Sequence, residues 1–423
     1  MSPQWLNALQ SMGISAELCK TAWEASEATA TARQKIREIG AINHWKVLAA
    51  LQAEGLSELH LQGTTGYGYN DSGRELLDRV YCRVFETAAA LLRAQCISGT
   101  HAITAGLFGN LLPGQEMVCV TGAPYDTLRT IIGHREPVIG SLTEMGIGYR
   151  ELDLLEDGSM NLAAFADFLS PKTRLVLLQR SRGYSWRQSF TVAALGEAIA
   201  HLRSLRPELT IMVDNCYGEL VELTEPSQVG ADLVAGSLIK NLGGGVAPTG
   251  GYLVGTEKTI ERSAARLIAP SLGLEMGPSL GLNRLFLQGL FQAPLAVSQA
   301  LEGSVWASYL LDKLGFKVSP RWDEPRTDLI LAVEMGTPEG QAAFIRGIQN
   351  AGPVDHRAVP EAYRQPGYPD PILMAGGSFV AGSSIELSAD GPVRPPYVCY
   401  LQGGLHFAQV QLGVLRSIQA LKG

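Results

Sequence analysis

The sequence predicts an α/β protein, with a large domain on a mainly parallel central sheet and a smaller C-terminal α+β domain. Two observations carry this prediction. From Gln95 onward, short apolar runs alternate with helix-length segments, as in a parallel sheet covered on both faces. The chain also has 423 residues, more than one hydrophobic core usually serves. We therefore expect an N-terminal helical segment over 1–60, the large domain over 61–300 and the small domain over 301–423.

The expected elements follow from local patterns along the chain. An alanine-rich segment with isoleucines at helical spacing predicts a helix over 22–54, followed by a glycine- and tyrosine-rich loop over 63–73. Further helices are expected over 74–93, 279–314, 339–349 and 408–421. Strands are expected at apolar runs over 117–121, 175–179, 211–214 and 233–236, and within 317–335 and 384–402. The proline- and glycine-rich segment 353–382 is long for a plain connection, which indicates a functional or mobile loop.

Charge and cysteine content argue against several classes of protein. The net charge of −7, with basic residues scattered along the chain, gives no reason to bind nucleic acid or an anionic membrane. The six cysteines form no CxxC pair and have no zinc-ligand spacing, so we expect reduced thiols and no metal site. We find neither a secretory leader pattern nor an apolar run of membrane-spanning length. The sequence therefore predicts a cytoplasmic protein that acts on a small molecule.

Two strand ends carry residues suited to cofactor chemistry. The apolar run 211–214 ends in Asp214, at the edge of a parallel sheet where ligands bind. A carboxylate there suits a pyridinium nitrogen, although such residues also cap helices or bind magnesium. The next run leads to Ser237 and Lys240 in a glycine-flanked, apolar setting, where a lysine loses its proton more easily. A surface lysine is the alternative, and neither nucleotide fingerprint, GxxxxGK[ST] or GxGxxG after a strand, is present.

Two further segments offer a phosphate seat and an aromatic stack. Ser98, Gly99 and Thr100 precede an expected helix, so their backbone N–H groups suit a phosphate, or they simply cap that helix. His101 beside them is interpreted as structural. Tyr125 follows the strand expected over 117–121, where its ring can stack on a flat cofactor and its hydroxyl can act as acid or base. Simple packing is the alternative for Tyr125.

Taken in order, these motifs resemble a known family. SGTHAI (98–103), APYDTL (123–128), VDNCYGE (213–219) and GSLIKNLGGG (236–245) resemble the fold-type I enzymes of pyridoxal 5′-phosphate (PLP), which have an aspartate aminotransferase-like fold. The chain is more closely similar to the cystathionine/methionine γ-lyase-related proteins called aluminium resistance proteins. That narrower match rests on TGYGYNDSGRE (65–75), APTGGYLVG (247–255) and RPPYVCYLQGGLHF (394–407). The resemblance covers roughly residues 30–420.

The resemblance implies roles at matching positions. Lys240 would hold PLP as a Schiff base and move the substrate's α-proton, and Asp214 would pair with the pyridine nitrogen. The phosphate would be bound at Ser98, Gly99 and Thr100, helped by the Ser237 hydroxyl. Tyr125 would stack on the ring.

The resemblance also implies residues from a second subunit and from the small domain. Tyr67 and Tyr69 match a segment that reaches the neighbouring subunit's phosphate, so we expect a homodimer or homotetramer with shared active sites. The arginine usual in that segment is missing, and Arg74 is a possible substitute. Arg394 or Arg182 would clamp the substrate carboxylate, since a guanidinium fork matches it, although a surface ion pair is the alternative for either.

The function implied is a carbon–sulfur lyase acting on a sulfur-containing amino acid of the cystathionine or methionine type, by β- or γ-elimination. One fold and one cofactor serve many reactions, so an aminotransferase or aldolase-like PLP enzyme is the first alternative. A non-catalytic PLP-binding stress protein is the second. A nucleotide-dependent enzyme is disfavoured because both fingerprints are missing.

Overall fold

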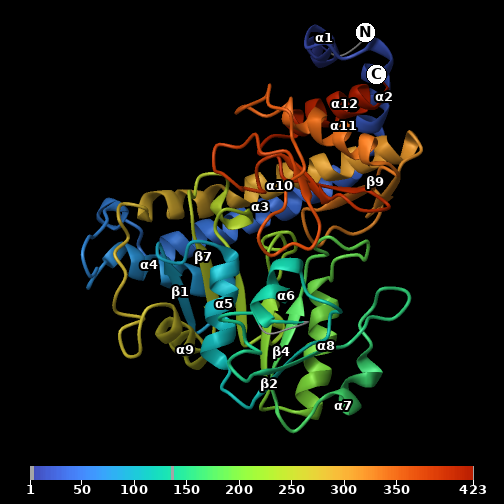
Figure 1. Ribbon diagram of the computed structural model, residues 1–423. Helices are drawn as coiled ribbons and strands as arrows, with labels where there is room; N and C mark the ends of the chain where they lie inside the picture. The colour runs from blue at the N-terminus through green and yellow to red at the C-terminus, as the bar shows by residue number, and fades with distance from the viewer. Residues whose placement is uncertain (1–3, 135–137, 423) are drawn as a thin grey trace.

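The computed structural model describes residues 4–134 and 138–422, and within them a seven-stranded sheet forms the centre of the large domain (Figure 1). Its spatial order is β1-β7-β6-β5-β4-β2-β3. The strands are β1 (Ala89–Arg93), β2 (Glu116–Cys119), β3 (Gly148–Glu151), β4 (Thr173–Gln179), β5 (Thr210–Asp214), β6 (Leu233–Ser237) and β7 (Gly251–Gly255). Strand β7 runs in the opposite direction to the other six strands, so the predicted mainly parallel sheet is confirmed.

Helices cover both faces of this sheet. They are α3 (Ala30–Ala53), α4 (Ser72–Phe85), α5 (Gly99–Asn110), α6 (Asp126–Ile132), α7 (Phe165–Phe168), α8 (Val192–Leu205), α9 (Glu257–Leu267) and α10 (Asn283–Lys313). Alternation along β4 divides its side chains between two cores. Val176 and Leu178 pack with α3, α4, α8 and α10, whereas Leu175 and Leu177 pack with α5, α6 and α9. Burial on both faces explains why this strand reads as a continuous apolar run.

A five-stranded antiparallel sheet forms the smaller domain, in the order β10-β11-β12-β9-β8. Its elements are β8 (Lys317–Ser319), β9 (Leu331–Glu334), α11 (Pro338–Gln349), β10 (Ile372–Met374), β11 (Ser388–Pro392), β12 (Val398–Gln402) and α12 (Phe407–Lys422). One face packs on α11 and α12. The N-terminal helices α1 (Gln4–Ser11) and α2 (Ala16–Ala28) join the same core, at the end of the molecule where both termini lie (Figure 1).

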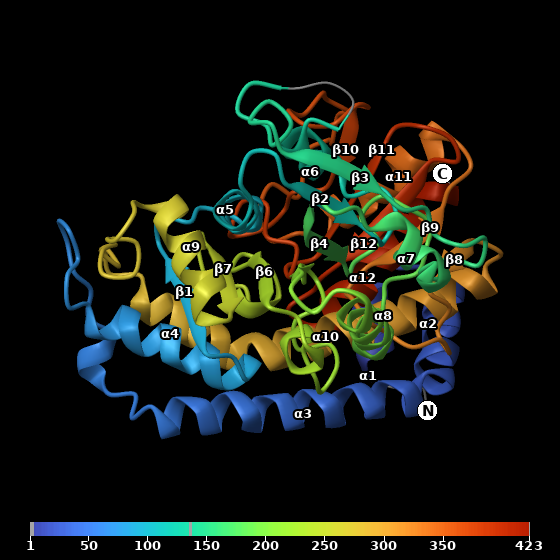
Figure 2. The same cartoon turned by 90° about the horizontal axis from the view of Figure 1, so that it is seen from below.

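Helix α10 connects the two domains. Its residues up to Val305 belong to the large-domain core and those from Trp306 to the small-domain core, so residue 300 lies within a continuous helix. Helix α3 lies alongside it through much of the molecule (Figure 2). Gly40 permits this approach, since a Cβ there would lie 2.9 Å from Ser298 Cβ. Arg37 adds hydrogen bonds of 3.0 and 2.7 Å to the buried Glu302 carboxylate.

Three features differ from expectation. The helix predicted over 22–54 is divided between α2 and α3, with Thr29 between them. The helix predicted over 74–93 ends at Phe85, because Glu86 takes a left-handed conformation (φ 52°), and residues 89–93 form strand β1 instead. Strand β3 was not expected from the sequence. The segment 353–382 contains the short strand β10 and otherwise neither helix nor further strand. In the described part of the chain, no helix combines the length and apolar character that crossing a membrane requires.

Asp71 anchors the loop over 63–71 to two helices. It caps α4 by accepting a hydrogen bond from the Arg74 N–H at 3.0 Å. It also accepts hydrogen bonds from Thr64 and Ser279, and from Asn283 Nδ2 of α10 at 3.0 Å. Burial raises the pKa of the Asp71 carboxyl, but the hydrogen bonds outweigh burial and lower the pKa to about 2.

Asp71→Asn should destabilise the protein in a pH-dependent way. A carboxyl whose pKa is lower in the folded state stabilises above its unfolded pKa of 3.8, and this contribution is lost as the pH falls toward 2. We expect Asp71→Asn to lower the free energy of unfolding by about 2 kcal/mol at neutral pH, with a smaller difference below pH ~4. Urea unfolding across this range tests it, with Asp153→Asn at an exposed carboxylate as control. A pH-independent difference would contradict the assignment.

Candidate active site

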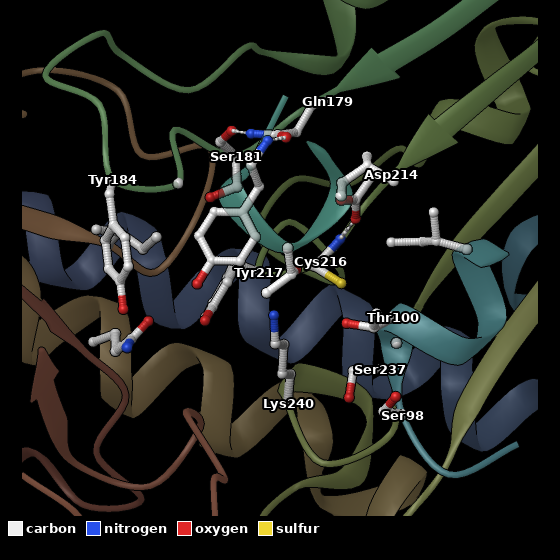
Figure 3. Close-up of a pocket in the computed structure, with 18 of the residues that line it drawn as sticks. Ser98, Thr100, Gln179, Ser181, Tyr184, Asp214, Cys216, Tyr217, Ser237 and Lys240 are labelled. Carbon is white, nitrogen blue, oxygen red and sulfur yellow. Dashed lines mark hydrogen bonds between the residues drawn. The ribbon is translucent and has the colours of Figure 1, made fainter. Parts of the chain in front are cut away.

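A cavity of about 220 Å³ lies between the two sheets and is called here the central cavity. Its large-domain wall comes from the carboxyl ends of β4, β5 and β6 and from the start of α5. Its small-domain wall comes from Asp390 of β11, Tyr400 and Gln402 of β12, and Ile330. Seven residues singled out in the sequence line it together: Ser98, Gly99, Thr100, Tyr125, Asp214, Ser237 and Lys240. Figure 3 labels five of them: Ser98, Thr100, Asp214, Ser237 and Lys240. The cavity is the candidate active site.

The start of α5 forms a cradle for an anion. Ser98 caps the helix, its Oγ accepting from the His101 N–H at 3.1 Å, and the first N–H groups of a helix have no carbonyl partner within it. A Cβ on Gly99 would lie 2.9 Å from Ser237 Cβ, so only glycine lets the helix approach β6 this closely. Thr100 and Ser237 add hydroxyl groups to the same wall. The predicted phosphate seat therefore has the local structure that it needs.

Asp214 ends strand β5 as predicted, and it is nearly buried. Its Oδ1 accepts a hydrogen bond from the Cys216 N–H at 3.1 Å. Burial raises the pKa of the Asp214 carboxyl, and the positive charge of Lys240 opposes that shift. A buried carboxylate of this kind gains most from a protonated ring nitrogen, because a charge-assisted hydrogen bond offsets its desolvation.

Lys240 lies beside Tyr217, with Nζ 3.7 Å from the centre of the tyrosine ring. Burial lowers the pKa of the Lys240 amine, but Coulomb interactions with its neighbours raise it more, led by Cys216 and Tyr217 and followed by Asp214 and Glu219. The direction of this shift is opposite to the one expected from the apolar sequence around Lys240. The apolar sequence around Lys240 did not reveal these neighbours, because tertiary structure brings them together.

An aromatic cluster closes the cavity beside Tyr125. The Tyr125 N–H donates to Gln179 Oε1 at 2.7 Å, which fixes the start of α6. The Tyr125 and Tyr184 ring centroids are 5.5 Å apart, and the Tyr125 hydroxyl is hydrogen-bonded to that of Tyr368. Burial raises the pKa of Tyr125 well above its ordinary value, so the hydroxyl stays protonated. Tyr368 lies in the long segment 353–382, which thus reaches the site.

The remaining candidate residues lie outside the central cavity. Tyr67 is 71% exposed and Tyr69 48% exposed, and their ring centroids are 6.0 Å apart. Arg74 is buried and donates to the Gly68 and Gly277 carbonyl oxygens at 2.6 and 2.9 Å. It is therefore held within its own chain and is not free to replace the missing arginine.

The two arginines expected at the substrate carboxylate are also engaged elsewhere. Arg182 is buried and donates to the carbonyl oxygen and hydroxyl of Ser319 at 3.0 and 3.1 Å. Arg394 pairs with Asp370 at 2.7 Å and lines a separate pocket. Within the described residues, the wall of the central cavity contains no arginine.

Sequence reasoning missed several residues of the cavity. Tyr217 follows Asp214 by three positions, and its positive φ of 72° turns it toward Lys240. Tyr184 comes from the loop after β4, and Asp390, Tyr400 and Gln402 come from the small domain. For the last three, alternation along β11 and β12 was the available signal. It could not show which face meets the large domain.

With this geometry established, comparison with known proteins identifies the family. The family model for methionine gamma-lyase matches residues 18–422. The chain belongs to the methionine gamma-lyase family. The resemblance inferred from the motifs is thereby confirmed, and so is the fold-type I architecture.

Two similar proteins illustrate the family match, and a third shares the fold. The chain is 47% identical over 405 residues to the uncharacterized protein YnbB of Bacillus subtilis, with 96% of each chain covered. A carbon–sulfur lyase involved in aluminum resistance from Clostridium novyi has a similar structure, with a TM-score of 0.94, 42% identity and 99% of both chains covered. A PLP-dependent Escherichia coli protein, YhfS, shares the fold at 20% identity, with a TM-score of 0.61 over 91% of this chain and 97% of that one.

The family implies PLP, and the residues of the cavity fit that cofactor. The start of α5 with Ser237 suits the phosphate, Asp214 suits a protonated ring nitrogen, and Lys240 supplies an amine for covalent attachment. The cradle at Gly99 is the most telling feature, because a side chain there would fill the space beside Ser237.

Gly99→Ala should weaken PLP binding without unfolding the protein. The added methyl must push Ser237, and overpacking of this kind costs about 1–3 kcal/mol, so the dissociation constant should rise about tenfold. An absorbance titration of the apoprotein with PLP measures it. Gly376→Ala is the control, because a Cβ there meets nothing within 4 Å. An unchanged dissociation constant in Gly99→Ala would contradict the assignment of the phosphate seat to the start of α5.

Proposed function

We propose that the protein is a PLP-dependent carbon–sulfur lyase acting on a sulfur-containing amino acid of the cystathionine or methionine type. The observation that carries the proposal is that Lys240, Asp214 and the anion cradle of α5 line one cavity. Family membership and the carbon–sulfur lyase from Clostridium novyi add support. Whether the sulfur leaves from the β- or the γ-carbon stays open.

The chain's own residues divide the work of this reaction. When bound, PLP supplies an electron-accepting ring that stabilises negative charge on the substrate α-carbon. Asp214 would keep the ring nitrogen protonated, and the Lys240 amine, in its uncharged form, would take the proton from the α-carbon. Tyr125, whose hydroxyl stays protonated, would donate a proton to the departing sulfur. The rings of Tyr184 and Tyr368 pack against Tyr125 and fix the position of its hydroxyl.

A second copy of the chain is part of the proposal. Tyr67 and Tyr69 are exposed on a loop that Asp71 holds in place. Residues that contact a neighbouring subunit must be exposed in this way on the single chain. The proposed assembly is a homodimer or homotetramer in which these rings reach the partner's phosphate seat. An aminotransferase or aldolase-like reaction, or PLP binding without catalysis, stays the alternative.

The first prediction of the proposal concerns Lys240. Purified protein should absorb near roughly 420 nm, as a lysine-bound PLP does, and Lys240→Ala should lose or shift this band. Lys258→Ala, at an exposed lysine on α9, should keep it. With L-cystathionine or L-methionine, the wild type should release a thiol and a 2-oxo acid. Amino-group exchange with 2-oxo acids without thiol would favour the aminotransferase, and a colourless protein that takes up no PLP would refute the proposal.

A second prediction concerns the hydrogen bond between Tyr125 and Tyr368. Tyr368→Phe removes a partner worth about 1 kcal/mol, so kcat for thiol release should fall about fivefold while KM and the PLP absorbance change little. The control is Tyr363→Phe, which alters an exposed tyrosine in the same segment. An unchanged kcat would mean that Tyr368 does not position the Tyr125 hydroxyl.

A further inference from the structure

The small-domain wall of the central cavity carries an acidic residue where a basic one was expected. The ionisable carboxylates and amines lining the cavity, within the described residues, are Asp214, Lys240 and Asp390. Asp214 and Lys240 have their roles in the proposed reaction. Asp390 has none, and it comes from β11 on the opposite side of the cavity.

Strand geometry fixes Asp390 on this wall. Ala389 packs in the small-domain core with α11 and α12, so the next residue along β11 faces the other way. Asp390 pairs in register with Tyr400 of β12, and both residues line the cavity together with Gln402. The carboxylate is therefore held by a sheet and cannot easily turn away.

The Asp390 side chain is only partly satisfied. It is 8% exposed, and its Oδ2 accepts a hydrogen bond from Gln402 Nε2 at 3.2 Å. Its Oδ1 is buried and has no hydrogen-bond partner within the described residues. Burial raises the pKa of the Asp390 carboxyl to about 7, although a hydrogen bond from Tyr184, the charge of Lys240 and the hydrogen bond from Gln402 oppose that shift. A buried oxygen without a partner is costly unless a ligand supplies a donor.

We propose that Asp390, with Gln402 beside it, binds a positively charged amino group at the far end of the substrate. The inference rests on the proposed function: Lys240 places the reacting end of the substrate at the large-domain wall, which leaves the opposite end to β11 and β12. A carboxylate alone at that end would meet a like charge, whereas an ammonium group, alone or beside a carboxylate as in cystathionine, would satisfy Oδ1. The preferred substrate is then a sulfur-containing diamino acid, whose leaving thiol carries the second amine.

Binding without turnover gives the first test. L-lysine and L-2-aminoheptanoate have side chains of the same length and differ in a terminal ammonium or methyl group. Isothermal titration of the PLP-loaded wild type should show L-lysine binding about tenfold tighter or more, since a site built around a polar contact rejects the ligand lacking it. Asp390→Asn should bring the two affinities within about threefold. The control Asp370→Asn, at the partner of Arg394 outside the cavity, should keep the preference.

Turnover gives the second test. S-(2-aminoethyl)-L-cysteine and S-propyl-L-cysteine, with their homocysteine homologues for γ-elimination, form matched pairs. The wild type should favour the aminoethyl substrate in kcat/KM by about tenfold, and Asp390→Asn should abolish that ratio. Equal affinities for both ligands in the wild type, or a preference that survives Asp390→Asn, would overturn the inference. An equal loss of rate on both substrates with the ratio kept would assign Asp390 to packing or proton transfer and also overturn it.

The two proposals fail in different ways. If no substrate releases a thiol but the L-lysine preference depends on Asp390, the lyase assignment falls and the ammonium site stands. If thiol is released from both members of a pair at equal kcat/KM, the lyase assignment stands and the ammonium site falls. Thermal unfolding and the PLP absorbance of Asp390→Asn establish that the variant is folded and loaded.

Discussion

The pairing of three parallel strands, β4, β5 and β6, is the constraint on which the central cavity depends. Their register sets Gln179 opposite Asp214 and Asp214 opposite Ala235, two residues before Ser237. Gln179 holds Tyr125, Asp214 is suited to a ring nitrogen, and Ser237 lines the phosphate seat. Their side chains therefore emerge at one sheet edge. Parallel strands need long crossovers, so residues far apart in sequence meet there without any local signal of contact.

Buried polar contacts behind that edge hold the turn after β5. Arg180 donates to Asn215 Oδ1 and to the Gly218 carbonyl oxygen, each at 2.8 Å, and Asn215 in turn donates to Glu225 at 2.9 Å. The turn includes Tyr217, whose positive φ is unfavourable for a side chain of its size. Such strain persists where surrounding contacts fix the backbone, and here it sets the tyrosine ring against Lys240.

The large-domain wall was predictable from the sequence, whereas the small-domain wall was not. Asp214, Ser237 and Lys240 follow apolar strands directly, so the local pattern places them at a sheet edge. Arg182 and Arg394 were chosen for their chemistry, and the sequence did not reveal their tertiary neighbours: Ser319 engages the first and Asp370 the second. Strand β1 was missed for a related reason. Its alanines and leucines suit a helix, but the left-handed turn at Glu86 and pairing with β7 override that propensity.

This division between walls has a chemical consequence. The residues suited to the cofactor sit on the large sheet and at the start of α5, while the residues that face them across the cavity come from β11 and β12. A change in Asp390 or Gln402 can therefore alter which substrate fits without disturbing Asp214, Lys240 or the phosphate seat. Most of the motifs that carry the family resemblance lie in the large domain, so the resemblance speaks more strongly for the cofactor than for the substrate. The substrate has to be argued from the charge of the opposite wall, which in this chain is acidic.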